Sequence, residues 1–195
     1  MTIACKNNTN EGQEVIAEET LETNTEEIKK TITGSFSDFN RLIEDEEDGG
    51  MMLLGKIDRE GLEADDFTSW YQENYKGHSL DTITTQQLKP YIEGITIKVF
   101  MGTWCEDSQR EIPALFKVLD TVKFDKSNLD LVAVTHDKVT PQGYEEGYNI
   151  EYVPTIIFMK DRKELNRIVE YTQVTLEKDM LAILTGADYT PGYAD

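Results

Sequence analysis

The sequence predicts an α/β fold in which a central mixed sheet carries helices on both faces. An apolar, β-branched run at residues 95–101 is typical of a fully buried strand, and apolar residues at helical spacing follow it: Ile112, Leu115, Phe116 and Leu119. A second apolar run at residues 129–134 completes a strand–helix–strand unit, which is a parallel, right-handed crossover. Residues 155–160 and 164–171 flank a polar turn and predict an antiparallel hairpin.

Composition suits one domain of ordinary size plus a tail. The chain has 195 residues and a formal charge of −19, with 38 acidic against 19 basic residues. Such a balance excludes binding of nucleic acid or anionic lipid through charge. No run approaches the roughly 18 apolar residues of a membrane helix, so we expect no transmembrane segment. We expect the folded part to be a monomer.

The first residues, Met-Thr-Ile-Ala-Cys, resemble the lipobox that ends a bacterial lipoprotein signal peptide. The resemblance implies lipidation of Cys5 and a lipid anchor in the cell envelope, facing the periplasm. Residues 6–33 are rich in Glu, Asn and Thr and cannot bury enough surface to order themselves. We therefore expect residues 1–33 to form a disordered tether, a remnant of the signal and its linker. The alternative is a disordered cytoplasmic N-terminus with an incidental cysteine.

We assign residues 34–195 to the domain, with an N-terminal helical extension. Four apolar residues at helical spacing predict that extension: Phe36, Phe39, Leu42 and Ile43. The acidic run at residues 44–48 then ends the helix, and we interpret the run as a solvated loop rather than a cation site. Residues 51–54 are expected to form the first strand of the domain.

Three further helices are expected around the sheet. Asp65 or Asp66 can cap a helix that ends at Gly77 and carries an aromatic stripe, which we expect to pack in the core: Phe67, Trp70, Tyr71 and Tyr75. A short helix begins near Thr84 and leads into residues 95–101. The last helix begins after Thr175, ends at Gly186 and carries Leu176, Met180, Ile183 and Leu184.

A cysteine lies where the central strand passes into its helix. The run there is Trp104-Cys105-Glu106-Asp107-Ser108, and Thr103 with Glu106 fits a capping box. The chain resembles the thioredoxin superfamily at this run, in Pro113 eight residues after the cysteine, and in Val153-Pro154-Thr155. The resemblance covers about residues 50–186 and implies a thioredoxin-like fold. It also implies a cis-proline loop that faces Cys105 and, with Trp104, shapes a substrate groove.

Two departures from the family pattern bear on mechanism. Ser108 stands where the second, resolving cysteine would be, and Val99 replaces a buried carboxylate that assists proton transfer. Cys105 is then the only nucleophile of the site, and Ser108 would donate a hydrogen bond to its thiolate. Release of a bound substrate would need an external thiol. The helix end favours the thiolate, whereas Glu106 and Asp107 disfavour it.

Other polar residues add weaker indications. His136 and Asp137 follow residues 129–134 at the sheet edge that carries Cys105, so His136 could serve as base or orienter with Asp137 holding it. A solvent-exposed turn histidine is the alternative. The two cysteines, Cys5 and Cys105, exclude a disulfide scaffold and a cysteine-based zinc cluster. We expect no metal and no cofactor.

Two functions of different classes follow from these residues. The first is a monothiol thiol–disulfide oxidoreductase or isomerase in redox homeostasis, with protein or low-molecular-weight thiols and disulfides as partners. Its catalytic residues would be Cys105 and Ser108, and its groove would comprise Trp104 and residues 153–155. The second is a thioredoxin-fold binding module in which Cys105 has no chemical role. Ordinary thiol reactivity, with partner binding that survives replacement of Cys105, would favour the second.

Overall fold

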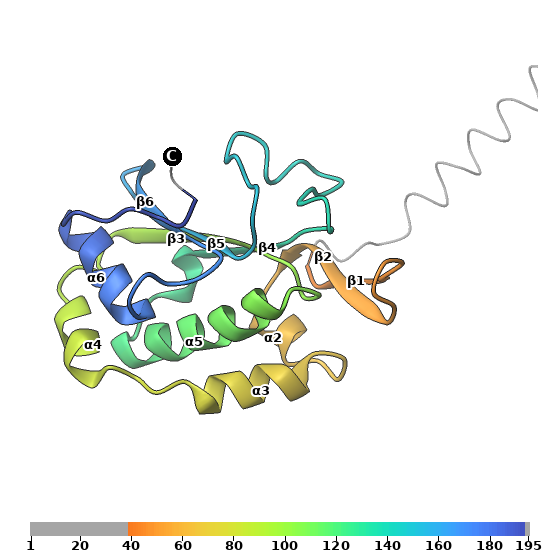
Figure 1. Ribbon diagram of the computed structural model, residues 1–195, viewed down its shortest axis with the longest axis horizontal. Helices are drawn as coiled ribbons and strands as arrows, with labels where there is room; N and C mark the ends of the chain where they lie inside the picture. The colour runs from red at the N-terminus through yellow and green to blue at the C-terminus, as the bar shows by residue number, and fades with distance from the viewer. Residues whose placement is uncertain (1–38, 194–195) are drawn as a thin grey trace, which may run out of the picture. The chain divides into compact units, whose positions relative to one another are not determined.

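The structure, a computed structural model, describes residues 39–193 of the 195-residue chain (Figure 1). Cys5 and the expected tether at residues 1–33 lie outside the described residues. No helix among residues 39–193 has the length and apolar character needed to cross a membrane. The fold is mixed α/β, as the sequence predicts.

A six-stranded mixed sheet organises the described residues, in the order β1-β2-β4-β3-β5-β6. The central pair β3 and β4 is parallel, and every other neighbouring pair is antiparallel. The predicted parallel crossover and C-terminal hairpin are therefore confirmed. The strands are β1 (Arg41–Glu44), β2 (Met51–Ile57), β3 (Ile95–Met101), β4 (Leu129–Ala133), β5 (Thr155–Lys160) and β6 (Lys163–Val169).

Helices connect these strands and begin mostly at capping side chains. They are α2 (Arg59–Leu62), α3 (Thr68–Gly77), α4 (Thr82–Leu88), α5 (Glu106–Val122) and α6 (Leu176–Thr185), with a 3₁₀ turn η1 (Lys126–Asn128) before β4. Asp58, Asp81 and Thr175 each accept a backbone N–H in the first turn of the helix that follows. The last helix ends as predicted, with Gly186 in the left-handed conformation at φ 71°.

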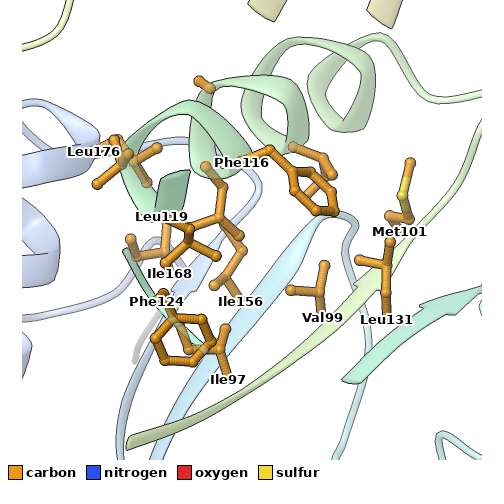
Figure 2. Close-up of a cluster of buried hydrophobic side chains, with 14 of the residues drawn as sticks. Ile97, Val99, Met101, Phe116, Leu119, Phe124, Leu131, Ile156, Ile168 and Leu176 are labelled. Carbon is orange, nitrogen blue, oxygen red and sulfur yellow. The ribbon is translucent and has the colours of Figure 1, made fainter. Parts of the chain in front are cut away.

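The main core lies between the sheet and its helices (Figure 2). Because successive side chains of a strand point to opposite faces, alternate residues of the central strands enter this core, among them Ile97, Val99, Met101, Ile156 and Phe158. Leu115 and Leu119 of α5 meet them from the helix side and are fully buried. The aromatic stripe packs here too, with Tyr71 fully buried, so its predicted core role is confirmed.

The expectation of helices on both faces is wrong. All the described α-helices lie on the face of the main core (Figure 1). A smaller cluster on the opposite face contains Phe100, Val132 and Ile157, and a long segment after β4 covers it with Tyr144, Tyr148 and Ile150. This segment, residues 134–154, forms turns without a helix. Gly143 and Gly147 both have positive φ there, a backbone conformation that does not continue a helix.

The predicted N-terminal helix is also wrong in its described part. Residues 41–44 form the edge strand β1, antiparallel to β2, with Leu42 opposite Leu53 and Ile43 opposite Met52. Exposure alternates along β1, as in a strand with one covered face. The spacing of Leu42 and Ile43 fits a helix equally well, but pairing with an apolar strand satisfies the backbone groups and outweighs local propensity.

Helix starts differ from prediction at three places. Cys105, rather than Thr103, is the N-cap of α5, and the Thr103 hydroxyl accepts the Leu53 N–H instead (3.1 Å). The N-cap of α3 is Phe67 and not an aspartate. The N-cap of α4 is Asp81, three residues before the expected start. Each difference is within the uncertainty of helix ends read from a sequence.

The first prediction concerns Asp130, which ties three strands together. Its carboxylate forms ion pairs with Lys56 of β2 and Lys98 of β3. Burial raises the pKa of Asp130, but the hydrogen bonds from Lys56 and Lys98 outweigh it, and the pKa falls below its ordinary 3.8. We expect Asp130→Asn to lower the free energy of unfolding by about 1 kcal/mol at pH 7. Urea unfolding of both proteins at several pH values measures this difference in the free energy of unfolding.

The sign of the pH dependence follows from that lowered pKa. The stabilisation by Asp130 is complete above the pKa of the unfolded chain and is lost as the pH falls through the lower pKa of the folded protein. The difference between wild type and Asp130→Asn should therefore shrink in acid. An equal difference at neutral and acid pH would contradict this origin.

Candidate functional site

Cys105 lies at the junction between β3 and α5, as predicted. It is the N-cap residue of α5, with φ −87° and ψ 121°, and its side chain caps no backbone group of the helix. The side chain is half-buried and its thiol is free. Cys105 Sγ donates a hydrogen bond to the Val153 carbonyl oxygen, at 3.2 Å. The helix end and the loop before β5 therefore meet at the sulfur.

The loop that receives this hydrogen bond precedes β5. The Val153–Pro154 peptide bond is cis, as the family resemblance implies. Val153 is buried in the smaller cluster, and Thr155 begins β5 with its hydroxyl bonded to the Tyr152 carbonyl oxygen (2.7 Å). The predicted groove residues 153–155 thus lie beside Cys105.

A groove continues from this loop. It has a volume of about 310 Å³, and Tyr152, Thr155 and Tyr193 line part of it. The Tyr152 and Tyr193 rings are stacked, with centroids 4.1 Å apart, and both side chains are exposed. The Glu170 carboxylate accepts a hydrogen bond from the Tyr193 hydroxyl, which raises the pKa of Tyr193 to about 12. The hydroxyl is therefore protonated at neutral pH.

Ser108 differs from its predicted role. The side chain is fully buried, and its Oγ accepts a hydrogen bond from the Gly102 N–H (3.2 Å). Within residues 39–193, no hydrogen bond joins Ser108 to Cys105. Ser108 therefore fastens the first turn of α5 to the end of β3 rather than contacting the sulfur.

The acidic residues after Cys105 are not equivalent. Asp107 pairs with Arg110 (2.6 Å), and the same guanidinium pairs with Glu111 (2.9 Å). Burial raises the pKa of Glu111, although the Arg110 hydrogen bond opposes this effect. The charge of Arg110 therefore offsets that of Asp107 in the first turns of α5, and Glu106 is the other acidic residue of the first turn.

Trp104 is packed against the backbone at Gly102 and against a histidine. Its indole lies so close to Gly102 that a Cβ there would be 2.4 Å from Cε2. The indole N–H donates to the Val134 carbonyl oxygen (3.0 Å). The ring stacks on His136, with centroids 4.1 Å apart and planes 18° apart. Trp104 is therefore held by the end of β3, the end of β4 and the segment that follows β4.

His136 has a different carboxylate partner from the one predicted. Its Nε2 lies 3.0 Å from Asp45 Oδ1, in the turn between β1 and β2, so Asp45 rather than Asp137 holds the ring. Burial raises the pKa of Asp45, but hydrogen bonds from His136 and from backbone N–H groups outweigh it and the pKa is lowered. Among the described contacts, His136 reaches Trp104 and not Cys105.

The sequence reasoning missed the grouping of Asp45 and Asp48 with His136. One potential donor atom of each residue lies within 4.8 Å of the others. Ninety-one positions separate Asp45 from His136. The signals in the sequence were an acidic run and a separate histidine, and only the pairing of β2 with β4 brings them together.

Comparison with known proteins gives no family for this chain. No family model and no curated protein matches it. The solved structures that are similar include a protein of unknown function from Pseudomonas aeruginosa and an HIV epitope scaffold, each 18% identical. The first has a TM-score of 0.45 and covers 61% of this chain and 81% of its own. The second has a TM-score of 0.46 and covers 62% and 83%.

Proposed function

We propose that the chain is a thioredoxin-like, monothiol thiol–disulfide oxidoreductase or isomerase with Cys105 as its nucleophile. The observation that carries this proposal is the contact of Cys105 Sγ with the Val153 carbonyl oxygen, directly before Pro154. This contact joins the thiol, at the start of a 17-residue helix, to the loop that carries the cis Val153–Pro154 bond. We propose that such a peptide occupies the groove at Tyr152 and Tyr193.

The proposed reaction is one exchange in two steps. The Cys105 thiolate attacks one sulfur of a substrate disulfide, forming a Cys105–substrate disulfide and releasing the other substrate sulfur as a thiolate. An external thiolate then attacks the mixed disulfide and regenerates the Cys105 thiolate. The external thiol leaves joined to the substrate sulfur. When that thiol belongs to the substrate itself, the net result is isomerisation.

Two features of the site support the first step. Cys105 is the N-cap residue of α5, and the free N–H groups and dipole of a helix start favour negative charge near it. Arg110 offsets one of the two carboxylates in the first turn. The Cys105 thiol donates a hydrogen bond to the Val153 carbonyl oxygen. A substrate backbone N–H that binds this carbonyl oxygen would displace the thiol proton.

The second step is external because the site has no second thiol. Ser108 is buried and bonded to Gly102, and a serine hydroxyl, whose pKa lies far above that of a thiol, is not ionised at neutral pH. The mixed disulfide therefore persists until a thiol arrives from solution.

Trapping of a mixed disulfide tests the proposal. We would use the full chain with Cys5→Ser, which leaves Cys105 as the only thiol, and an excess of a chromogenic aromatic disulfide at pH 7. We expect one equivalent of thiolate per folded chain, at a rate at least equal to that of free cysteine, and none from the variant that also carries Cys105→Ser. Reduced glutathione should then restore the thiol.

The same experiment distinguishes the binding module. If Cys105 reacts in urea but not in the folded protein, the thiol has no chemical role and the oxidoreductase proposal fails. Capture of a peptide that survives Cys105→Ser would then support a thioredoxin-fold binding module. Circular dichroism of both variants shows whether the fold is retained.

A further inference from the structure

We propose that Asp45, Asp48 and His136 bind a divalent metal ion of the Zn²⁺ or Mn²⁺ kind at the turn between β1 and β2. The inference is independent of the proposed thiol chemistry. It assigns a role to the β1–β2 turn and to a histidine that the thiol reaction does not use.

Convergence of donor atoms is the first argument. A ring nitrogen of His136 and one carboxylate oxygen each of Asp45 and Asp48 all lie within 4.8 Å of one another. Ligands held about 2.1 Å from a shared ion lie at most about 4.2 Å apart, so shifts of under about 1 Å complete the set. Three protein ligands leave further positions for water, as in metal sites that exchange ligands.

Asp45 is prepared to act as a ligand. It is 6% exposed, and its Oδ1 accepts the backbone N–H groups of Glu47 (3.1 Å) and Asp48 (3.2 Å). These two bonds hold the carboxylate in one orientation and favour its ionised form. A buried carboxylate needs hydrogen bonds or a cation to balance its charge, and His136 is the side chain that lies next to Asp45.

The environment of His136 is the second and independent argument. Its Nε2 faces Asp45 at 3.0 Å and its Nδ1 faces Glu47 at 3.7 Å. A neutral imidazole has one N–H, so it can donate to only one of two carboxylates, and its other nitrogen faces the second with a lone pair. A cation at Nε2 removes this conflict. Glu47 would then accept from Nδ1–H, which is the carboxylate–histidine–metal pattern of known sites.

The orientation of the ring is fixed before any ion arrives. Trp104 stacks on the imidazole, and its own indole N–H is bonded to Val134. The stacking therefore fixes the plane of the His136 ring, and both ring nitrogens face carboxylates of the β1–β2 turn. Confinement of this kind lowers the entropic cost of binding an ion.

Charge and donor type select the kind of ion. Residues 44–48 are all acidic, which attracts cations to the turn. Imidazole nitrogen suits zinc and other transition metals, whereas Ca²⁺ and Mg²⁺ take oxygen ligands almost exclusively. One imidazole with two carboxylates therefore favours Zn²⁺ or Mn²⁺ over Ca²⁺.

Titration calorimetry of the full chain with Zn²⁺, Mn²⁺ and Ca²⁺ tests this inference. We expect one Zn²⁺ or Mn²⁺ ion per chain and weaker binding of Ca²⁺. Asp48→Asn removes a proposed ligand on an exposed side chain and should weaken binding at least tenfold, as should His136→Gln. Glu46→Gln is the matched control, since it removes the same charge from the same turn without removing a ligand, and should weaken binding less than twofold.

A spectroscopic readout locates the ion. In a Trp70→Phe background Trp104 is the only tryptophan, and its fluorescence should change with the same saturation as the calorimetric signal. Equal loss of affinity in Asp48→Asn and Glu46→Gln would show that ions are attracted only by the diffuse charge of the turn, and would overturn the site. Absence of saturable binding, or binding that His136→Gln leaves unchanged in a folded protein, would overturn it too.

Discussion

Replacing Ser108 with cysteine is expected to shorten the lifetime of a Cys105 mixed disulfide by about a hundredfold. Ser108 lies in the first turn of α5, three residues after Cys105, where side chains of the cap and third helical positions are neighbours. A thiol there can attack Cys105 Sγ within the same molecule. The bond to the substrate breaks, a Cys105 disulfide with the introduced thiol forms, and the substrate sulfur leaves as a thiolate.

The magnitude follows from effective concentration. An intramolecular partner on a short connection acts at a concentration on the order of millimolar, whereas an external thiol supplied at about 10 µM is about a hundredfold more dilute. The buried position of Ser108 accommodates a sulfur of similar shape, and the Gly102 N–H that bonds its hydroxyl would stabilise the attacking thiolate.

The measurement is the decay of the mixed disulfide, followed by mass spectrometry in the Cys5→Ser background. Ser108→Ala serves as the matched control, because it also loses the bond to Gly102 but gains no thiol. The mixed disulfide of Ser108→Ala should persist as long as that of the protein that retains Ser108. If the cysteine variant decays no faster than the alanine variant, the two positions are not within reach of each other.

The part of the fold that the sequence predicts well is the part with long apolar periodicity. The runs at residues 95–101 and 129–134 and the helix between them are strongly patterned, and the structure places them as β3, β4 and α5. The terminal helix has both of its caps in the sequence, Thr175 and Gly186, and both are found.

The elements that were missed depend on contacts distant in sequence. The spacing of Leu42 and Ile43 fits a helix as well as a strand, and pairing with β2 decides that they form a strand. Residues 134–154 cover a sheet face with isolated aromatic side chains, which have no period at all. The smaller cluster needs only scattered apolar contacts, so it leaves no pattern in the sequence.

The candidate site divides in the same way. Cys105 and the loop at Pro154 were found because the short runs around them resemble motifs of a known family. The partner of His136 was not, since Asp137 is the neighbour in sequence but Asp45 is the neighbour in space. Ser108 was assigned to the sulfur because it stands where the resembled family has its second cysteine, whereas its hydroxyl is buried and bonded to Gly102.

Replacing Gly102 with alanine is expected to destabilise the fold by about 1–3 kcal/mol, the usual cost of overpacking. An added Cβ would lie 2.4 Å from Trp104 Cε2 and 2.7 Å from its Nε1. Gly102 does not have a positive φ angle, so the destabilisation by alanine comes from the steric clash and not from backbone strain. The indole would have to move away, losing its bond to Val134 and its contact with His136.

A pair of variants separates this clash from a general cost of replacing glycine. Gly77→Ala, at the last residue of α3, meets nothing within 4 Å and should leave stability unchanged or raise it by up to about 1 kcal/mol. Trp104→Ala removes the ring, so Gly102→Ala should cost much less in that background than in wild type.

Chemical denaturation of the four members of this cycle gives the coupling energy between positions 102 and 104. A cost of Gly102→Ala that is equal with and without the indole would contradict the steric explanation. A large coupling energy would show that Trp104 can pack against the backbone only because position 102 has no side chain. Trp104 directly precedes Cys105 and stacks on His136. The close packing of Trp104 on Gly102 therefore helps to position both the thiol and the proposed metal ligand His136.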